Sequence, residues 1–230
     1  AWAVWGPIFL LQAGGTALVS AGGAPEASAT LAPAWVAAWA AEVAWQLVFA
    51  CAPRPAAAAK RERRLAVMAP AAVLLLAAQG SMLVGAFRLS HSLRSRGASA
   101  SAAVALLLAL PTGMNAAWLA AASGIGLSIV AQLVPALAPI AAPKGAAVLL
   151  QGVVGAGFFA APALGGSPAA LPLGLGYSGA TAWACFGISR GDSPRQVKDV
   201  ARTGVKISAM SGVLTAVLAA YTGLAKRGHH

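Results

Sequence analysis

The chain has 230 residues, of which 59% are hydrophobic, 16 are Lys or Arg and 5 are Asp or Glu. The charges lie in short clusters between apolar stretches of about 20 residues, the length of α-helix that crosses a bilayer. A soluble domain could not bury so many of these stretches, and they lack the strict alternation of a transmembrane β-barrel. The sequence therefore predicts an all-α integral membrane protein, a polytopic bundle of six to seven transmembrane helices.

The formal net charge of +11 indicates contact with anionic lipid headgroups rather than with nucleic acid. Nucleic-acid binding is disfavoured because basic and aromatic residues do not combine on one soluble face. The expected partners are the lipid bilayer and other membrane protein subunits of a larger complex.

The apolar stretches follow one another along the chain, separated by Pro, Gly or charged residues. The predicted segments are 3–22, 33–52, 65–87, 102–134, 145–164, 171–189 and 207–224. The fourth segment is expected to be one kinked or tilted helix, because Pro111 removes a backbone hydrogen bond inside it. The last segment either spans the membrane or lies along its surface, because its first turns are amphipathic.

The charged residues are predicted to lie in the loops between these segments. The expected loops surround Pro25, contain the basic run 60–64, carry Arg88, His91, Arg94 and Arg96, and cover 190–206. In a seven-span arrangement, the loops after segments two, four and six hold eleven Lys and Arg and the other loops and the tail hold five. The positive-inside rule then places the 60–64 loop on the cytoplasmic side, or on the stromal side in a plastid.

Two stripes of aromatic and polar residues carry the predicted site. They lie at helical spacing in the first two segments, and Glu42 is the one carboxylate within these predicted spans. An aromatic wall with a few polar atoms suits a large planar apolar ligand, whereas the alternative is that both faces only pack the bundle. The predicted ligand-binding residues are Trp5, Phe9, Gln12, Trp35, Trp39, Glu42, Gln46 and Asn115.

Short motifs in the first half of the chain resemble the tryptophan-rich sensory protein/translocator (TspO/MBR) family. Residues 5–9, Trp-Gly-Pro-Ile-Phe, resemble the aromatic-Gly-Pro start of that family's first helix. Residues 42–45 followed by Phe49 resemble its helix with a Trp four residues before a Phe, and Trp118 after Pro111 resembles a later helix. The resemblance implies a five-helix bundle that binds tetrapyrroles, sterols or related lipophiles. Residues 1–135 are then a TspO/MBR-like core, and residues 136–230 add transmembrane helices and a short basic tail.

These observations together predict a function without catalysis. The chain has no paired carboxylates, zinc-spaced His and Cys, P-loop or Ser-His-Asp set, so no enzyme is expected. Oxygen-bearing side chains in apolar surroundings suit the magnesium of a chlorophyll, and a chain opening without Met fits import into an organelle. The sequence predicts an accessory subunit of a photosystem–antenna complex in the plastid thylakoid membrane, binding chlorophyll and carotenoid. The alternative is a stand-alone sensor or transporter of tetrapyrrole, sterol or another lipophile.

Overall fold

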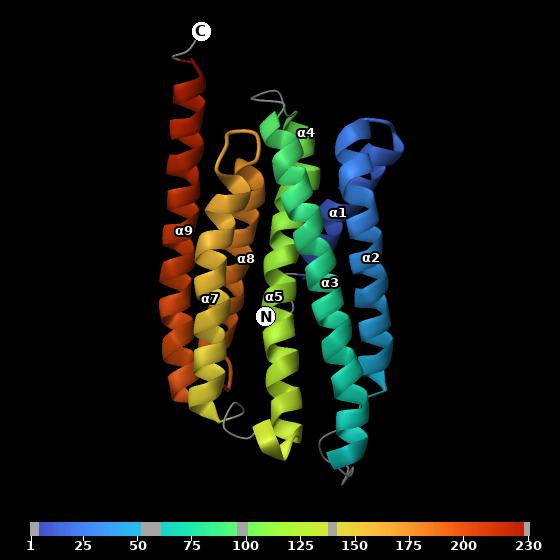
Figure 1. Cartoon of the computed structure of the whole chain (residues 1–230), viewed down its shortest axis with the longest axis vertical. Coiled ribbons are helices and arrows are strands. Elements are labelled where there is room, and N and C mark those ends of the chain that lie inside the picture. Colours follow the sequence, from blue (N-terminus) through green and yellow to red (C-terminus); the bar gives the residue numbers. More distant parts are fainter. Residues whose placement is uncertain (1–4, 52–60, 96–100, 138–141, 228–230) are drawn as a thin grey trace.

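The computed structural model describes residues 5–51, 61–95, 101–137 and 142–227, and the described residues form helices and no β-strand. The helices are joined by short connections and stand side by side along the long axis of the molecule (Figure 1). Their bounds are α1 (Trp5–Ser20), α2 (Pro25–Ala50), α3 (Arg61–Ser95), α4 (Ala102–Val104), η3 (Ala105–Ala109), α5 (Leu110–Leu133), η4 (Pro135–Leu137), α7 (Pro143–Gly165), α8 (Leu171–Arg190) and α9 (Arg195–Arg227).

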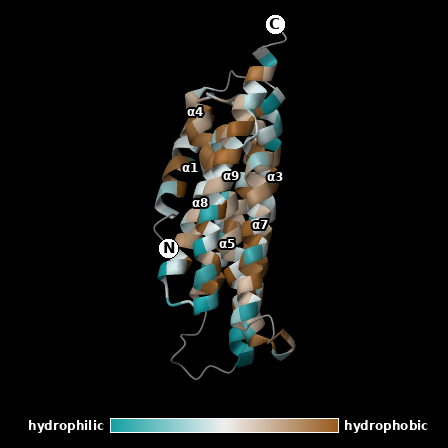
Figure 2. Ribbon diagram, turned by 90° about the vertical axis from the view of Figure 1, so that its left-hand side faces the viewer, coloured by the Kyte–Doolittle hydropathy of each residue, from teal (hydrophilic) through white to brown (hydrophobic). Residues whose placement is uncertain are grey.

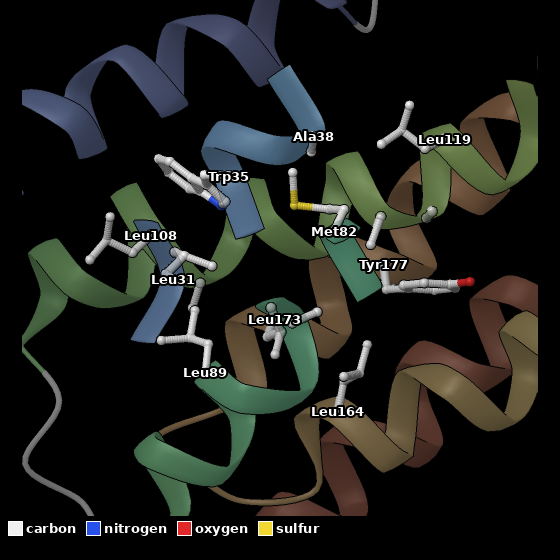
Figure 3. Close-up of a cluster of buried hydrophobic side chains, with 14 of the residues drawn as sticks. Leu31, Trp35, Ala38, Met82, Leu89, Leu108, Leu119, Leu164, Leu173 and Tyr177 are labelled. Carbon is white, nitrogen blue, oxygen red and sulfur yellow. The ribbon is translucent and has the colours of Figure 1, made fainter. Parts of the chain in front are cut away.

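Helix α5 is the centre of the bundle. It packs against α3 on one side and α8 on the other, while α2 covers α3 and the helices α7, α8 and α9 pack on one another. The short helix α1 packs mainly on η3 and α5, and it lies behind α2 and α3 in Figure 1. One continuous core takes its buried side chains mainly from α2, α3, η3, α5, α7 and α8 (Figure 3).

Among the described residues, four helices are long and apolar enough to cross a membrane: Arg61–Ser95, Ala102–Leu133, Pro143–Gly165 and Arg195–Lys226. The outside of the bundle is also apolar, since Leu10, Phe159 and Val213 expose 75%, 72% and 65% of their surface. Brown, hydrophobic stretches recur along the helices in Figure 2. So large an apolar surface is unfavourable in water and favourable in lipid, and the bundle is therefore that of a helical membrane protein.

The predicted count of six to seven spans is wrong, because the other described helices are too short or not apolar enough to cross a membrane. Helix α1 has 16 residues and is therefore only about 24 Å long, less than the roughly 30 Å of hydrocarbon. Helix α2 carries Glu26, Glu42 and Gln46, and α8 carries buried Ser178 and Thr181, so both fall short in hydropathy. The last segment, in contrast, lies along α7 and α8 as part of a candidate span and not apart from the bundle.

Several predicted loops are in fact parts of helices. Pro25 and Glu26 open α2, the run 61–64 opens α3, Arg88, His91 and Arg94 lie in its last turns, and 195–206 begins α9. The physical reason is helix length, because 35 residues extend about 52 Å and carry both charged ends of α3 beyond the hydrocarbon. Residues 60 and 96 lie outside the described residues.

Arginines at the two ends of α3 hydrogen-bond the ends of neighbouring helices. Arg61 donates through Nε to the carbonyl of Leu133 at 2.6 Å, where α5 ends. Arg94 donates to the carbonyl of Ala163, and Ser90 donates to that of Leu164 at 2.5 Å, where α7 ends. Cations at helix C-termini satisfy free carbonyls and oppose the helix dipole, so these two arginines fix α3 against α5 and α7.

The segment predicted as one helix is continuous from Ala102 to Leu133, as expected. Its irregular turn is the π-helix η3, which comes directly before Pro111. Because Pro111 has no N–H and its ring crowds the carbonyl four residues earlier, that of Leu107, a widened turn at this position is physically reasonable.

Glycines allow α5 and α8 to cross at backbone contact. A Cβ at Gly113 would overlap the carbonyl of Leu173, and one at Gly176 would overlap the carbonyl of Leu110. Close approach of this kind holds transmembrane helices together where no hydrophobic force acts between them. The Gly113–Gly176 crossing therefore requires glycine on both helices.

Gly176→Ala is expected to lower the midpoint of thermal unfolding in detergent, because the added methyl group must displace the Leu110 backbone at a cost of about 1–3 kcal/mol. The control is Gly179→Ala on the same helix, since a Cβ there meets nothing within 4 Å. The control should leave the midpoint unchanged or raise it, because Ala favours helix over Gly by about 1 kcal/mol. Equal midpoints for the two variants would contradict the crossing.

Candidate functional site

Hydrogen bonds between side chains link α2 to α1 and α5 inside the bundle. Asn115 of α5 donates through Nδ2 to Oε1 of Glu42 at 3.0 Å, and both side chains are buried. Trp39 donates through Nε1 to Oε1 of Gln12 on α1 at 3.2 Å. Trp35 donates to Oγ1 of Thr112 at 3.0 Å. We call the residues Gln12, Trp35, Trp39, Glu42, Thr112 and Asn115 the polar cluster.

Part of the polar cluster has no hydrogen-bond partner within the described residues. The atoms without one are Nε2 of Gln12, Oε2 of Glu42 and Oδ1 of Asn115, although their side chains are buried. A cavity of about 360 Å³ lies beside them, lined by Phe9, Gln12, Ala13, Thr16, Trp39, Glu42, Val43 and Gln46. Buried polar atoms are nearly always paired with protein, water or a ligand. This polar cavity can therefore hold a group that both donates and accepts hydrogen bonds.

The position of α1 is set by its contact with the π-helical turn. A Cβ at Gly15 would overlap the carbonyl of Leu107 and touch the ring of Trp35. Glycine at this point lets α1 lie directly on η3, while the longer side chains of Gln12 and Trp39 bridge from α1 to α2. The polar cavity occupies the space between these two helices.

A second cavity, of about 250 Å³, is walled by aromatic side chains from three helices. It is lined by Trp5, Trp45, Phe49, Met68, Ala71, Ala72, Leu75, Trp118, Ala121, Ala122, Ile125, Gly126, Ile129, Ala184 and Ile188. Trp5 stacks on Phe9 with ring centroids 5.0 Å apart and meets Trp118 edge-on at 5.9 Å. Trp45 lies 5.5 Å from Phe49. We call this space the aromatic cavity.

The wall of the aromatic cavity contains a buried polar atom. Trp118 is 6% exposed, and its Nε1 is buried with no hydrogen-bond partner among the described residues. An indole N–H is only a donor, and burying it unpaired costs about 1–3 kcal/mol. The unpaired donor thus belongs to a side chain of the cavity wall.

The structure divides the predicted site residues between the two cavities. Phe9, Gln12, Trp39, Glu42 and Gln46 line the polar cavity, and Asn115 and Trp35 join it through the polar cluster. Trp5 lines the aromatic cavity instead. The helical spacing of the two stripes thus identified residues that lie together, although ligand binding by them stays a prediction.

Sequence reasoning did not select four of the residues that complete these sites. Thr112 accepts the Trp35 hydrogen bond, and Trp45, Trp118 and Met68 line the aromatic cavity. Spacing offered a signal for two of them, because Trp45 and Trp118 each lie three residues after a buried polar residue, Glu42 or Asn115, on the same helical face. Thr112 and Met68 had no comparable signal.

The two cavities are apolar pockets with a few polar groups in their walls. Among the described residues, no three of the types His, Cys, Asp and Glu lie close enough together to hold a metal ion. Each cavity instead combines flat apolar walls with a small number of hydrogen-bonding atoms, which is the usual composition of a small-molecule site.

No family model matches this chain, and no match is found among curated proteins or solved structures. The resemblance to the TspO/MBR family therefore stays a prediction from the short motifs.

A double-mutant cycle tests the central contact of the polar cluster. Glu42→Ala and Asn115→Ala should each destabilise the protein, and their effects should fall short of additivity by about 0.5–3 kcal/mol because the two residues share one hydrogen bond. The measurement is chemical or thermal unfolding in detergent micelles.

The matched comparison is a cycle of Gln46→Ala with Asn115→Ala. Gln46 lies on the same face of α2 but is exposed, so these two effects should add. Additivity in the Glu42 cycle as well would show that the buried pair contributes nothing specific.

Proposed function

We propose that this chain is a non-enzymatic membrane subunit that binds a planar lipophilic ligand of the tetrapyrrole class, with chlorophyll as the leading candidate and a carotenoid as a second pigment. The observation that carries the proposal is the aromatic cavity with its unpaired donor, Nε1 of Trp118. Helix packing alone does not require a buried donor without an acceptor.

The walls of the aromatic cavity favour a flat ligand over a flexible one. Trp5, Trp45, Phe49 and Trp118 offer ring faces and edges, and aromatic rings contact other π-systems with favourable offset or edge-on geometry. The remaining wall comes from small and aliphatic residues of α3, α5 and α8. A macrocycle edge carrying a carbonyl or ester oxygen would accept the hydrogen bond of Trp118.

The polar cavity supports a second polar anchor in the same protein. Gln12 offers two amide hydrogens, and Glu42 and Asn115 offer oxygen atoms that have no partner within the described part of the chain. Oxygen ligands suit a hard ion such as the magnesium of a chlorophyll. A hydroxyl group of a carotenoid or sterol would also match this set, because it donates and accepts at once.

The apolar outside of the bundle supports a position within a larger membrane assembly. Phe87, Phe159 and Trp183 are exposed aromatic residues on different helices. In a photosystem–antenna complex of the thylakoid membrane, such surfaces would contact lipid, pigment or neighbouring subunits. The alternative is a stand-alone sensor or transporter that binds tetrapyrrole, sterol or another lipophile at the same cavities and releases it.

Trp118→Phe is expected to weaken chlorophyll a binding about threefold to tenfold, because it removes the indole donor and keeps an aromatic ring. Ala122→Phe, which projects a ring into the aromatic cavity, should abolish binding. The measurement is fluorescence quenching on titration of the detergent-solubilised chain, repeated with protoporphyrin IX and cholesterol.

The control for this titration is Trp183→Phe, because Trp183 is 46% exposed and lines neither cavity. This variant should bind chlorophyll a as the wild-type chain does. Equal affinity of the Trp118 and Trp183 variants would remove the support that the unpaired donor gives to the proposal.

Purification from native membrane separates the two forms of the proposed function. A subunit of a photosynthetic complex should co-purify with chlorophyll, carotenoid and photosystem proteins in mild detergent, as measured by mass spectrometry and absorption. A stand-alone sensor or transporter should purify without those proteins and should bind and release an added lipophile. A chain with neither resident pigment nor saturable binding would contradict both.

A further inference from the structure

A third cavity, of about 370 Å³, lies between α5 and α7 with α8 along one side. We call it the α5–α7 cavity. It shares five lining residues with the aromatic cavity, namely Ala121, Ile125, Ile129, Ala184 and Ile188, so the two spaces adjoin. Its other wall, formed by α7, belongs to this cavity alone and includes Ala146, Leu150 and Val153.

The α5–α7 cavity is elongated along the helices. On α5 its lining extends from Ala117 to Gln132, a rise of about 22 Å. A single leaflet accounts for about half of the roughly 30 Å of hydrocarbon, so one acyl chain fits within this length. The lining is mostly aliphatic, as a hydrocarbon chain requires.

One end of this cavity is formed by the beginnings of α7 and α9 and by the last turns of α5 and α8, which contribute Gln132 and Ile188. Pro143 is the first residue of α7, and Ser193 and Pro194 directly precede α9, whose Val197 also lines the cavity. Helix N-termini present free N–H groups and partial positive charge, and neither first turn contains an acidic residue.

The side chains at this end add positive charge. The basic residues within five positions of a lining residue at this end are Lys144, Arg190, Arg195, Lys198 and Arg202, and the acidic ones are Asp192 and Asp199. Arg61 bonds the carbonyl of Leu133, next to the lining residue Gln132. Asp199 accepts a hydrogen bond from Arg202 at 2.8 Å and lies 3.9 Å from Arg195. Lys144 and Lys198, each next to a lining residue, have no such ion pair among the described residues.

We propose that the α5–α7 cavity binds one anionic phospholipid of the bilayer. Its phosphate lies at the starts of α7 and α9 beside Lys144 and Lys198, and one acyl chain extends along α5 towards Ala117. The apolar length matches the acyl chain of such a lipid and the cationic opening matches its anionic headgroup. The site does not depend on tetrapyrrole binding in the aromatic cavity.

Native mass spectrometry of the delipidated full chain, reloaded with phosphatidylglycerol or phosphatidylcholine, tests the proposal. Wild-type protein should retain one phosphatidylglycerol in preference to phosphatidylcholine. The double variant Lys144→Gln/Lys198→Gln should bind phosphatidylglycerol about thirtyfold more weakly, since each lysine near a lipid phosphate contributes about fivefold. Ala146→Phe, which narrows the apolar part, should reduce the binding of either lipid.

The matched control is Arg63→Gln/Arg64→Gln, which removes the same charge from the start of α3, at the end of the bundle where α7 and α9 also begin (Figure 1); neither residue lines the cavity. It should keep the preference for phosphatidylglycerol, as should Trp118→Phe, so failure of this site is separable from failure of the tetrapyrrole site. An equal loss in the Arg63/Arg64 control, or equal binding of both lipids by wild type, would overturn the proposal. Displacement of the lipid by millimolar inorganic phosphate would also overturn it, since the acyl chain would then contribute nothing.

Discussion

The interaction on which the interior depends is the hydrogen bonding of α2 to the helices around it. Glu42 in particular is 2% exposed, and an unpaired carboxyl group in such surroundings is costly. Its bond to Asn115 fixes the register of α2 against α5. Trp35 likewise bonds Thr112 of α5, and Trp39 bonds Gln12 of α1. These hydrogen bonds couple the positions of α1, α2 and α5.

Elsewhere the bundle is held by small residues and by arginines at its two ends. Gly113 and Gly176 bring α5 and α8 to backbone contact, while Arg61 and Arg94 bond the terminal carbonyls of α5 and α7. The glycine crossing lies inside the lipid, where no hydrophobic force drives helices together. The arginine hydrogen bonds lie at the membrane surface and oppose the dipoles of the helix ends. Neither the glycine crossing nor the arginine hydrogen bonds involve a residue of the polar cluster.

Sequence periodicity located every major helix because each apolar stretch is bounded by Pro, Gly or charge. Periodicity placed the ends of α3 and α9 wrongly. Their charged residues lie in helical turns outside the hydrocarbon, whereas a charged composition by itself favours a loop. Periodicity also placed Trp39, Glu42 and Gln46 on one face of α2, because residues three and four apart share a helical face. That Gln12 of α1 lies against this face did not follow from spacing. Trp35 and Thr112 lie 77 positions apart in the sequence, so no local pattern could predict their hydrogen bond.

The Gly113–Gly176 crossing also bears on where the cavities lie. On α5 and α8 both apolar cavities are lined only by residues beyond this contact, from Ala117 onward and from Thr181 onward. The crossing thus lies between the first turns of α5 and α8, which are packed backbone to backbone, and the later turns of both helices, which line the two cavities.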